Sequence, residues 1–115
     1  MDDIQRGELW WVSVKGDDSE PDGRRPALII QIDAGNKQPS YPNTIVALLS
    51  TSGREQLPFH IKLLPSKSNG LLDVSFVKCE QILTISKKRL EDYIGKVTQK
   101  EMQQVEDGMR LILGL

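Results

Sequence analysis

Apolar side chains recur in short runs along most of the chain, and their spacing is typical of β-strands. In residues 8–14, Trp10, Val12 and Val14 occupy every second position, which predicts a strand with one buried face. Residues 27–32 begin with four consecutive apolar residues, which favours a strand buried on both faces. Further strands are predicted over residues 44–51, 59–64, 72–78 and 81–85.

Two helices are predicted in the last third of the chain. Serine caps helix N-termini well, so Ser86 predicts a short helix over residues 86–93. Near the C-terminus, Thr98 and Glu101 have the spacing of a capping box, and Gly114 is placed to end the helix. Its apolar stripe, which we expect to pack on the core, consists of Met102, Val105, Met109 and Ile112.

Polar segments rich in Gly and Pro separate these elements, and the longest lie at residues 15–25 and 33–43. Many short strands followed by one amphipathic helix predict a mainly β fold of the α+β class, a small antiparallel barrel with a C-terminal helix. A chain of 115 residues has room for one core, so a single domain over residues 1–115 is expected.

No apolar run approaches the roughly 20 residues that cross a bilayer. The first residues are acidic, whereas a secretory signal begins with positive charge, so we expect a cytoplasmic protein without membrane contact. The single cysteine, Cys79, excludes an intrachain disulfide and is expected to be a small buried residue. The net charge of −1 argues against a generic basic nucleic-acid binder, although residues 59–97 hold seven Lys/Arg and only four Asp/Glu.

Several enzyme classes lack their residues in this sequence. The only histidine, His60, has no His, Cys or carboxylate at ligand spacing, so no metal site is expected. There is no glycine-rich phosphate loop and no Gly-x-Ser-x-Gly motif, and a Ser/His/Asp triad would have to recruit His60. We expect His60 to lie on a strand surface, and we expect no cofactor.

Two groups of residues remain as candidates for chemistry. Arg24 and Arg25 follow the first long loop, where they are either a solvated pair beside a turn or a clamp for phosphate oxygens. Ser50, Thr51 and Ser52 end the third predicted strand, where the hydroxyls either stabilise the turn or donate to a phosphate. The residue types alone leave both alternatives open for each group.

These same residues belong to segments that resemble the MazF/PemK family of toxin ribonucleases. The resemblance is carried by four ordered motifs and by the C-terminal helix: Arg6-Gly7-Glu8-Leu9-Trp10-Trp11-Val12, then Ser19-Glu20-Pro21-Asp22-Gly23-Arg24-Arg25-Pro26-Ala27, then Val46-Ala47-Leu48-Leu49-Ser50-Thr51 with Leu57-Pro58-Phe59, and Cys79-Glu80-Gln81-Ile82-Leu83-Thr84-Ile85. The sequence departs from the family pattern at Pro21, where glutamine is usual, and at Arg24, a second cation.

The resemblance implies an SH3-like barrel of CcdB/MazF topology that works as a homodimer, cuts single-stranded RNA and is neutralised by a cognate antitoxin protein. By position, Arg25 matches the family's catalytic arginine and Thr51 its catalytic threonine. The hydroxyls on either side of Thr51 leave open whether Ser50 takes that role. The residues expected to bind RNA are Glu20, Arg24, Ser50, Ser52 and Gln81.

The implied reaction is attack by the RNA 2′-hydroxyl, which gives a 2′,3′-cyclic phosphate and a 5′-hydroxyl. Arg25 is suited to neutralise charge on the phosphoryl oxygens, and Thr51 to donate a hydrogen bond to one of them. Two alternatives remain at this stage. One is a non-catalytic toxin like the CcdB inhibitors of DNA gyrase, and the other is a barrel that binds RNA without cutting it.

Overall fold

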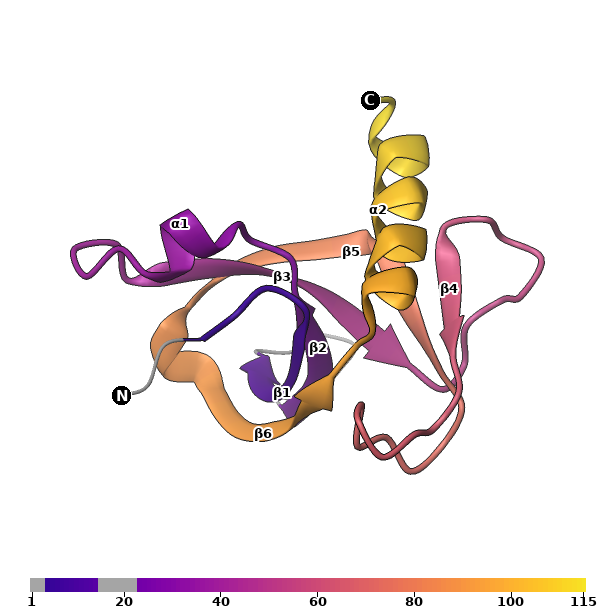
Figure 1. Ribbon diagram of the computed structural model, residues 1–115, viewed down its shortest axis with the longest axis horizontal. Helices are drawn as coiled ribbons and strands as arrows, with labels where there is room; N and C mark the ends of the chain where they lie inside the picture. Colours follow the sequence, from indigo (N-terminus) through magenta and orange to yellow (C-terminus); the bar gives the residue numbers. More distant parts are fainter. Residues whose placement is uncertain (1–3, 15–22) are drawn as a thin grey trace.

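A single antiparallel sheet forms the framework of the computed structural model, which describes residues 4–14 and 23–115. Within these residues the sheet has six strands in the order β4-β5-β3-β2-β1-β6 (Figure 1). The strands are β1 (Glu8–Val14), β2 (Gly23–Ile29), β3 (Asn43–Ser50), β4 (His60–Leu63), β5 (Ser75–Ser86) and β6 (Leu90–Lys96). The helices are α1 (Asp33–Asn36), the 3₁₀ turn η1 (Lys87–Arg89) and α2 (Gln99–Leu113).

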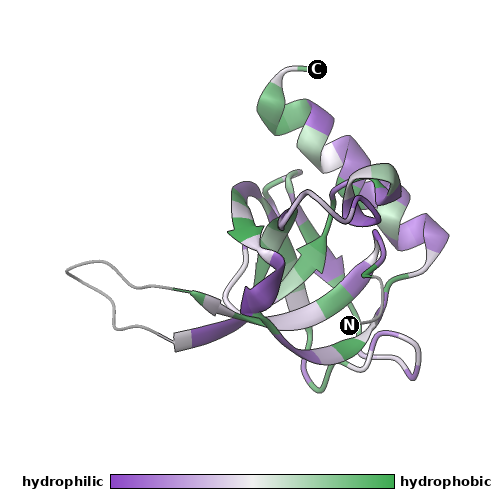
Figure 2. Cartoon of the chain, turned by 90° about the vertical axis from the view of Figure 1, so that its left-hand side faces the viewer, coloured by the Kyte–Doolittle hydropathy of each residue, from purple (hydrophilic) through white to green (hydrophobic). Residues whose placement is uncertain are grey.

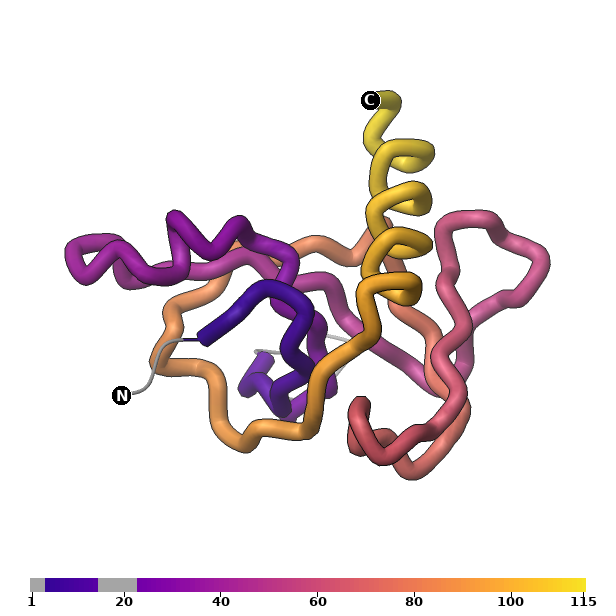
Figure 3. The backbone as a smooth tube through the Cα atoms, viewed as in Figure 1, coloured from indigo at the N-terminus to yellow at the C-terminus, as the bar shows by residue number. Residues whose placement is uncertain are grey.

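The sheet curls into a partly open barrel, which the backbone trace makes clear (Figure 3). Its edge strands are β4 and β6, and the described part of the chain contains no pairing between them. The prediction of a mainly β, α+β fold with a C-terminal helix is therefore confirmed, and hydrogen bonds do not close the barrel.

The core lies on both faces of the sheet, because successive residues of a strand point to opposite sides. The first face, here called the helix face, is covered by α2 and includes Leu9, Leu28 and Leu49. The second, here called the concave face, includes Val12, Ala27, Ile29, Val46 and Leu48. The prediction of one buried face for residues 8–14 was incomplete, since Leu9 is as fully buried as Val12.

The C-terminal helix follows its sequence signals closely. The Thr98 hydroxyl accepts the Glu101 N–H at 3.1 Å, and the Glu101 carboxylate accepts the Thr98 N–H at 2.8 Å. Gly114 ends α2 with a left-handed φ of 71°. Of the predicted stripe, Met102 and Val105 are buried, Met109 is half-buried and Ile112 is exposed.

The chain approaches itself very closely where α2 crosses β5 and where the turn at residues 66–70 crosses β6. A Cβ added to Gly108 of α2 would lie 2.9 Å from the Sγ of Cys79, which is fully buried as expected. Burial raises the pKa of the Cys79 thiol to about 11. At the second crossing Lys96 donates its N–H to the Ser68 carbonyl at 2.9 Å, and a Cβ on Gly95 would overlap the Asn69 carbonyl.

Two predicted elements differ in the structure. The predicted strands 72–78 and 81–85 are one strand, β5, with an irregularity at residues 78–81. The helix predicted over residues 86–93 was wrong beyond Arg89. Ser86 does cap η1 by accepting the Lys88 N–H at 3.2 Å, but the following residues form β6. Pairing with β1, including an edge-to-face contact of Trp10 with Tyr93, outweighs the local helix signal.

Smaller differences concern element ends. The loop predicted over residues 33–43 contains α1, whose buried Asn36 accepts hydrogen bonds from Gln31 and Thr44. The second strand begins at Gly23 and ends at Ile29, earlier than the predicted 27–32. No helix in residues 4–14 and 23–115 is long and apolar enough to cross a membrane.

Candidate functional site

Strand register brings Arg25 and Ser50 to the same face of the sheet. Arg25 lies on β2 beside β1, opposite the buried Val12 of the concave face. In the next strand pair Ala27 lies opposite Leu48, and this register carried two residues further sets Arg25 opposite Ser50. A guanidinium and a hydroxyl thus face the same side at the end of two neighbouring strands.

An irregular segment of β5, the strand next to β3, contains a third polar candidate, Gln81. Between the pairs Ala47–Ile82 and Leu49–Val77 the register shifts, so that residues 78–81 have no regular partners on β3. Leu83 packs on the concave face and Cys79 on the helix face, so the alternation of side chains along β5 reverses between these two residues, where Gln81 lies. Bulges commonly re-aim side chains beside functional sites. Arg25, Ser50 and half-buried Gln81 thus come from three adjacent strands.

The hydroxyl residues form a tight turn immediately after β3. The Ser50 Oγ accepts the Ser52 N–H at 3.1 Å and lies 2.8 Å from the Ser52 Oγ. Ser50 is half-buried, whereas Thr51 and Ser52 are exposed. After them Gly53 packs against Phe76 so closely that a Cβ would overlap the ring. The turn therefore has a defined shape, which is set partly by Ser50 itself.

Thr51 and Arg24 belong to the opposite, helix face by the same register. Thr51, Trp11 and Pro26 line a cavity of about 280 Å³. The other residues that line this cavity are Gly70, Leu71, Leu72, Asp73, Ser75 and Ile94. No pattern in the sequence indicated this cavity, because its walls come from segments that are distant in the chain. Thr51 therefore borders a mainly apolar hollow, whereas Ser50 shares a face with Arg25.

Arg24 interacts with two carboxylates and one aromatic ring. Its Nη1 donates to the Asp92 Oδ2 at 2.7 Å and lies 3.5 Å from the Glu91 Oε1. Its Cζ lies 4.6 Å from the centre of the Trp11 ring. The hydrogen bond to Asp92 raises the pKa of Arg24 above its ordinary value. An RNA phosphate would have to compete with two carboxylates for this cation.

His60 differs most from its expected place. It is 8% exposed rather than on a strand surface, and it joins two segments near the site. Its Nδ1 accepts the Arg54 N–H at 3.0 Å, and its Nε2 lies 2.8 Å from the Glu80 Oε2. Burial, the largest single influence, raises the pKa of Glu80, but the hydrogen bond from His60, a backbone hydrogen bond and the nearby positive charge of Lys78 together bring that pKa below its ordinary value.

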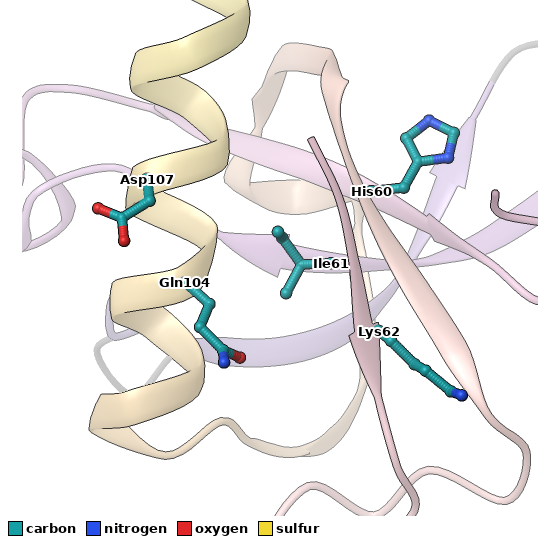
Figure 4. Close-up of a pocket in the computed structure, with 5 residues that line it drawn as sticks. All are labelled: His60, Ile61, Lys62, Gln104 and Asp107. Atoms are coloured by element: carbon teal, nitrogen blue, oxygen red, sulfur yellow. The ribbon is translucent and has the colours of Figure 1, made fainter. Parts of the chain in front are cut away.

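A shallow groove of about 350 Å³ lies between β4 and α2. Figure 4 shows that Ile61 turns toward α2, whereas His60 and Lys62 lie on the other side of the strand. Gln104 and Asp107 line the groove from α2. Among the described residues, no group of three His, Cys, Asp or Glu side chains is arranged to hold a metal ion. Glu20, which was expected to bind RNA, lies outside the described residues.

Comparison with known proteins identifies similar sequences over nearly the whole chain. Residues 5–113 match the family model described as the PemK-like, MazF-like toxin of type II toxin–antitoxin systems. A curated protein of Staphylococcus epidermidis named endoribonuclease MazF is 33% identical over 117 residues, which cover 97% of this chain and 92% of that protein.

Solved structures with the same fold include two toxins of other bacteria. An endoribonuclease from a mycobacterial species, solved in complex with its cognate antitoxin, has a TM-score of 0.81 at 24% identity and covers 97% of this chain and 96% of its own. MazF from Deinococcus radiodurans has a TM-score of 0.77 at 20% identity, with all of both chains covered. At these identities the structures support the fold.

Proposed function

Because this chain belongs to the PemK-like, MazF-like toxins of type II toxin–antitoxin systems, we propose that it is an endoribonuclease that cuts single-stranded RNA at short specific sequences. The observation that carries the proposal is the family match over residues 5–113. The position of Arg25 and Ser50 on one face of the sheet, with Gln81 on the adjacent strand β5, supports it. The match favours the ribonuclease over the gyrase inhibitor and over a barrel that only binds RNA.

The proposed mechanism needs few groups because RNA supplies its own nucleophile. The 2′-hydroxyl attacks the adjacent phosphorus, the bond to the 5′-oxygen breaks, and a 2′,3′-cyclic phosphate and a 5′-hydroxyl result. Arg25 neutralises charge that develops on the phosphoryl oxygens, since a guanidinium presents two parallel donors to a phosphate. A hydroxyl at the end of β3 donates to a non-bridging oxygen, and Gln81 contacts the RNA beside it.

The structure favours Ser50 over Thr51 as this hydroxyl donor, although family position first suggested Thr51. The register that sets Ser50 opposite Arg25 sends the Thr51 side chain to the other face. There Thr51 and Arg24 border the cavity beside Trp11. We therefore propose Arg25 and Ser50 for the phosphate, with Thr51, Ser52 and Arg24 contacting flanking nucleotides, where Arg24 exchanges its carboxylate partners for phosphate.

Cleavage in the presence of a chelator tests the proposed function. Purified protein incubated with a long single-stranded transcript is expected to cut it equally well with and without excess EDTA, because attack by the 2′-hydroxyl needs only positioned donors. End analysis should find 2′,3′-cyclic phosphates and 5′-hydroxyls. Intact transcript at every enzyme concentration, or activity that EDTA abolishes and Mg²⁺ restores, contradicts the proposal.

Single alanine variants separate the two hydroxyl candidates. We expect Ser50→Ala to lower kcat by roughly tenfold or more, about the effect of losing one hydrogen bond to a charged group. Thr51→Ala is expected to change KM more than kcat, because its side chain lies on the other face. The measurement is single-turnover cleavage of one short RNA. A larger loss of kcat in Thr51→Ala than in Ser50→Ala would identify Thr51 as the hydroxyl that donates to the phosphate.

We further propose that the protein acts in the cytoplasm as a homodimer and is neutralised by a separate antitoxin. Leu111, Leu113 and Leu115 are more than half exposed around the C-terminal end of α2, where Figure 2 shows hydrophobic residues, and this apolar end is available for pairing. The antitoxin is expected to carry an acidic, disordered segment that folds across the sheet face that carries Arg25 and Ser50 and competes with RNA phosphate for Arg25.

Salt is expected to weaken this neutralisation, since ions screen contacts between carboxylates and exposed guanidinium groups. The test is co-purification with the product of the neighbouring gene, followed by cleavage assays at increasing salt. Light scattering at micromolar concentration measures the oligomeric state. A monomer in this measurement contradicts the proposed homodimer. Tight antitoxin binding that leaves RNA cleavage intact contradicts competition between the antitoxin and RNA for Arg25.

A further inference from the structure

His60 connects the two segments that flank the proposed RNA site. One segment is the turn after β3, which carries the hydroxyls and continues to Arg54. The other is the irregular part of β5, where Glu80 immediately precedes Gln81. The His60 ring lies between them and hydrogen-bonds to both, at 3.0 Å to the Arg54 nitrogen and 2.8 Å to the Glu80 carboxylate.

The two hydrogen bonds assign the protonation state of the ring. Nδ1 accepts a backbone N–H, so it carries a lone pair and no hydrogen. The proton of the neutral ring is then on Nε2, which donates it to Glu80. This arrangement uses both ring nitrogens of a side chain that is 6% exposed. A second proton could enter only at Nδ1, where it would confront the Arg54 N–H.

The loop between β3 and β4 depends on His60 at more than one point. Leu57 donates its N–H to the Arg54 carbonyl at 3.0 Å, and the His60 N–H is donated to the Leu57 carbonyl at 3.0 Å. Arg54 is therefore held at its nitrogen by the His60 ring and at its oxygen by a chain that returns to the His60 backbone. On the other side of Arg54, Gly53 is fitted against Phe76. Ser50 and Thr51 are only a few residues away.

We propose that His60, paired with Glu80, is a positioning residue that holds the hydroxyl turn and Gln81 in register for RNA cleavage, and that it releases the turn when Nδ1 is protonated. The proposal rests on the proposed ribonuclease function. It adds to that function a positioning residue that does not contact RNA, and it predicts the direction in which cleavage depends on pH. Cleavage should fall on acidification, because the doubly protonated ring loses its acceptor for Arg54 while it keeps Glu80.

Charged side chains from β5, α2 and β4 lie near the His60 ring. From β5, Lys78 is the cross-strand partner of His60 and Glu80 is its hydrogen-bond partner. From α2, Asp107 lines the same groove. On β4, Lys62 pairs with Glu55 of the loop at 3.1 Å, exposed to solvent. Among the described residues, Glu80 is the one of these groups that hydrogen-bonds to the ring, and its lowered pKa favours its ionised form.

Two substitutions of His60 each remove one of the two hydrogen bonds of the ring and keep the other. In His60→Asn the amide oxygen takes the place of Nδ1, so the variant keeps an acceptor for Arg54 and loses Glu80. In His60→Gln the amide NH₂ reaches the place of Nε2, so the variant keeps a donor for Glu80 and leaves the Arg54 N–H without an acceptor. Neither amide titrates. Lys62→Gln is the control, because it breaks an exposed ion pair between the same loop and β4.

We expect His60→Gln to lower kcat by roughly tenfold or more and His60→Asn to lower it less, with both assayed well below their melting temperatures. Lys62→Gln should cut like the parent protein. The parent's kcat should fall on acidification, and this fall should be absent in His60→Asn. Full kcat in His60→Gln, or the same acid limb in His60→Asn as in the parent, overturns the proposal.

NMR of the parent protein distinguishes failure of this proposal from failure of the ribonuclease function. The amide signals of Thr51, Arg54 and Gln81 should shift with the same midpoint as the His60 ring nitrogens. Independent midpoints overturn the positioning role whether or not the protein cuts RNA. If the signals shift together but no RNA is cut at any pH, the positioning of the two segments stands and the ribonuclease function fails.

Discussion

Replacing Arg25 with alanine is expected to lower RNA cleavage by about a hundredfold to a thousandfold, the usual effect of removing one charged or hydrogen-bonding group from a transition-state site. Arg25 is half-buried near the start of β2, so the sheet should keep its pairing when the side chain is shortened. The loss should therefore appear in kcat, with little change in melting temperature. Arg25→Lys should recover only part of it, since an ammonium lacks the planar fork of the guanidinium.

The neighbouring residue provides the matched control for this experiment. Arg24→Ala removes a cation of the same type from the opposite face, where Asp92 and Trp11 already engage it. We expect a severalfold rise in KM and nearly unchanged kcat, measured by single-turnover cleavage beside Arg25→Ala. Near-normal cleavage by Arg25→Ala, together with loss in Arg24→Ala, would move the phosphate site to the helix face and to Thr51.

The second large effect concerns stability. Gly95→Ala is expected to lower the free energy of unfolding by about 3 kcal/mol, because the added methyl group overlaps the Asn69 carbonyl at the crossing of β6 with the turn at residues 66–70. The atoms nearest to the added methyl group belong to the backbone of Ser68 and Asn69, so no flexible side chain can move away to make room. The hydrogen bond from the Lys96 N–H to the Ser68 carbonyl holds the two backbone segments together. The melting temperature should fall by about 10 °C or more, measured by circular dichroism or calorimetry.

Gly23→Ala controls for the general effect of a methyl group on a strand glycine. A Cβ at Gly23 meets nothing within 4 Å, and this residue lies in the same sheet. Its variant should unfold within about 0.5 kcal/mol of the parent, as most surface substitutions do. Equal melting temperatures for Gly95→Ala and the parent would mean that β6 and the turn can separate without cost, contrary to the crossing described above.

Local signals in the sequence predicted the elements that depend on neighbouring residues. The capping box of Thr98 and Glu101 and the apolar run from Ala27 were interpreted correctly because their causes lie within a few residues. The strand β6 was missed because its cause, pairing with β1, lies far away in the chain. Ser86 predicted a helix over residues 86–93, but it caps only the single turn of η1.

The candidate site shows the same division. Residue type marked the pair Arg24 and Arg25 and the hydroxyl run only as candidates, and the family resemblance singled out Arg25 and Thr51 among them. The sequence could not say which hydroxyl faces Arg25, because a register shift of one residue moves every side chain to the other face. His60 was misplaced because its partner Glu80 is twenty residues away and only the pairing of β4 with β5 brings them together.

The position of β1 between β2 and the edge strand β6 also bears on when a newly made molecule is completely folded. β1 pairs with β2, which follows it directly, and with β6, which is made only after most of the chain. During synthesis the first three strands therefore exist while one side of β1 has no partner, and α2, which covers the helix face, is made last of all. Contacts between the two ends of a chain form late in folding. We therefore expect each copy to complete its fold, and with it to gain the proposed ribonuclease activity, only after its own synthesis is finished.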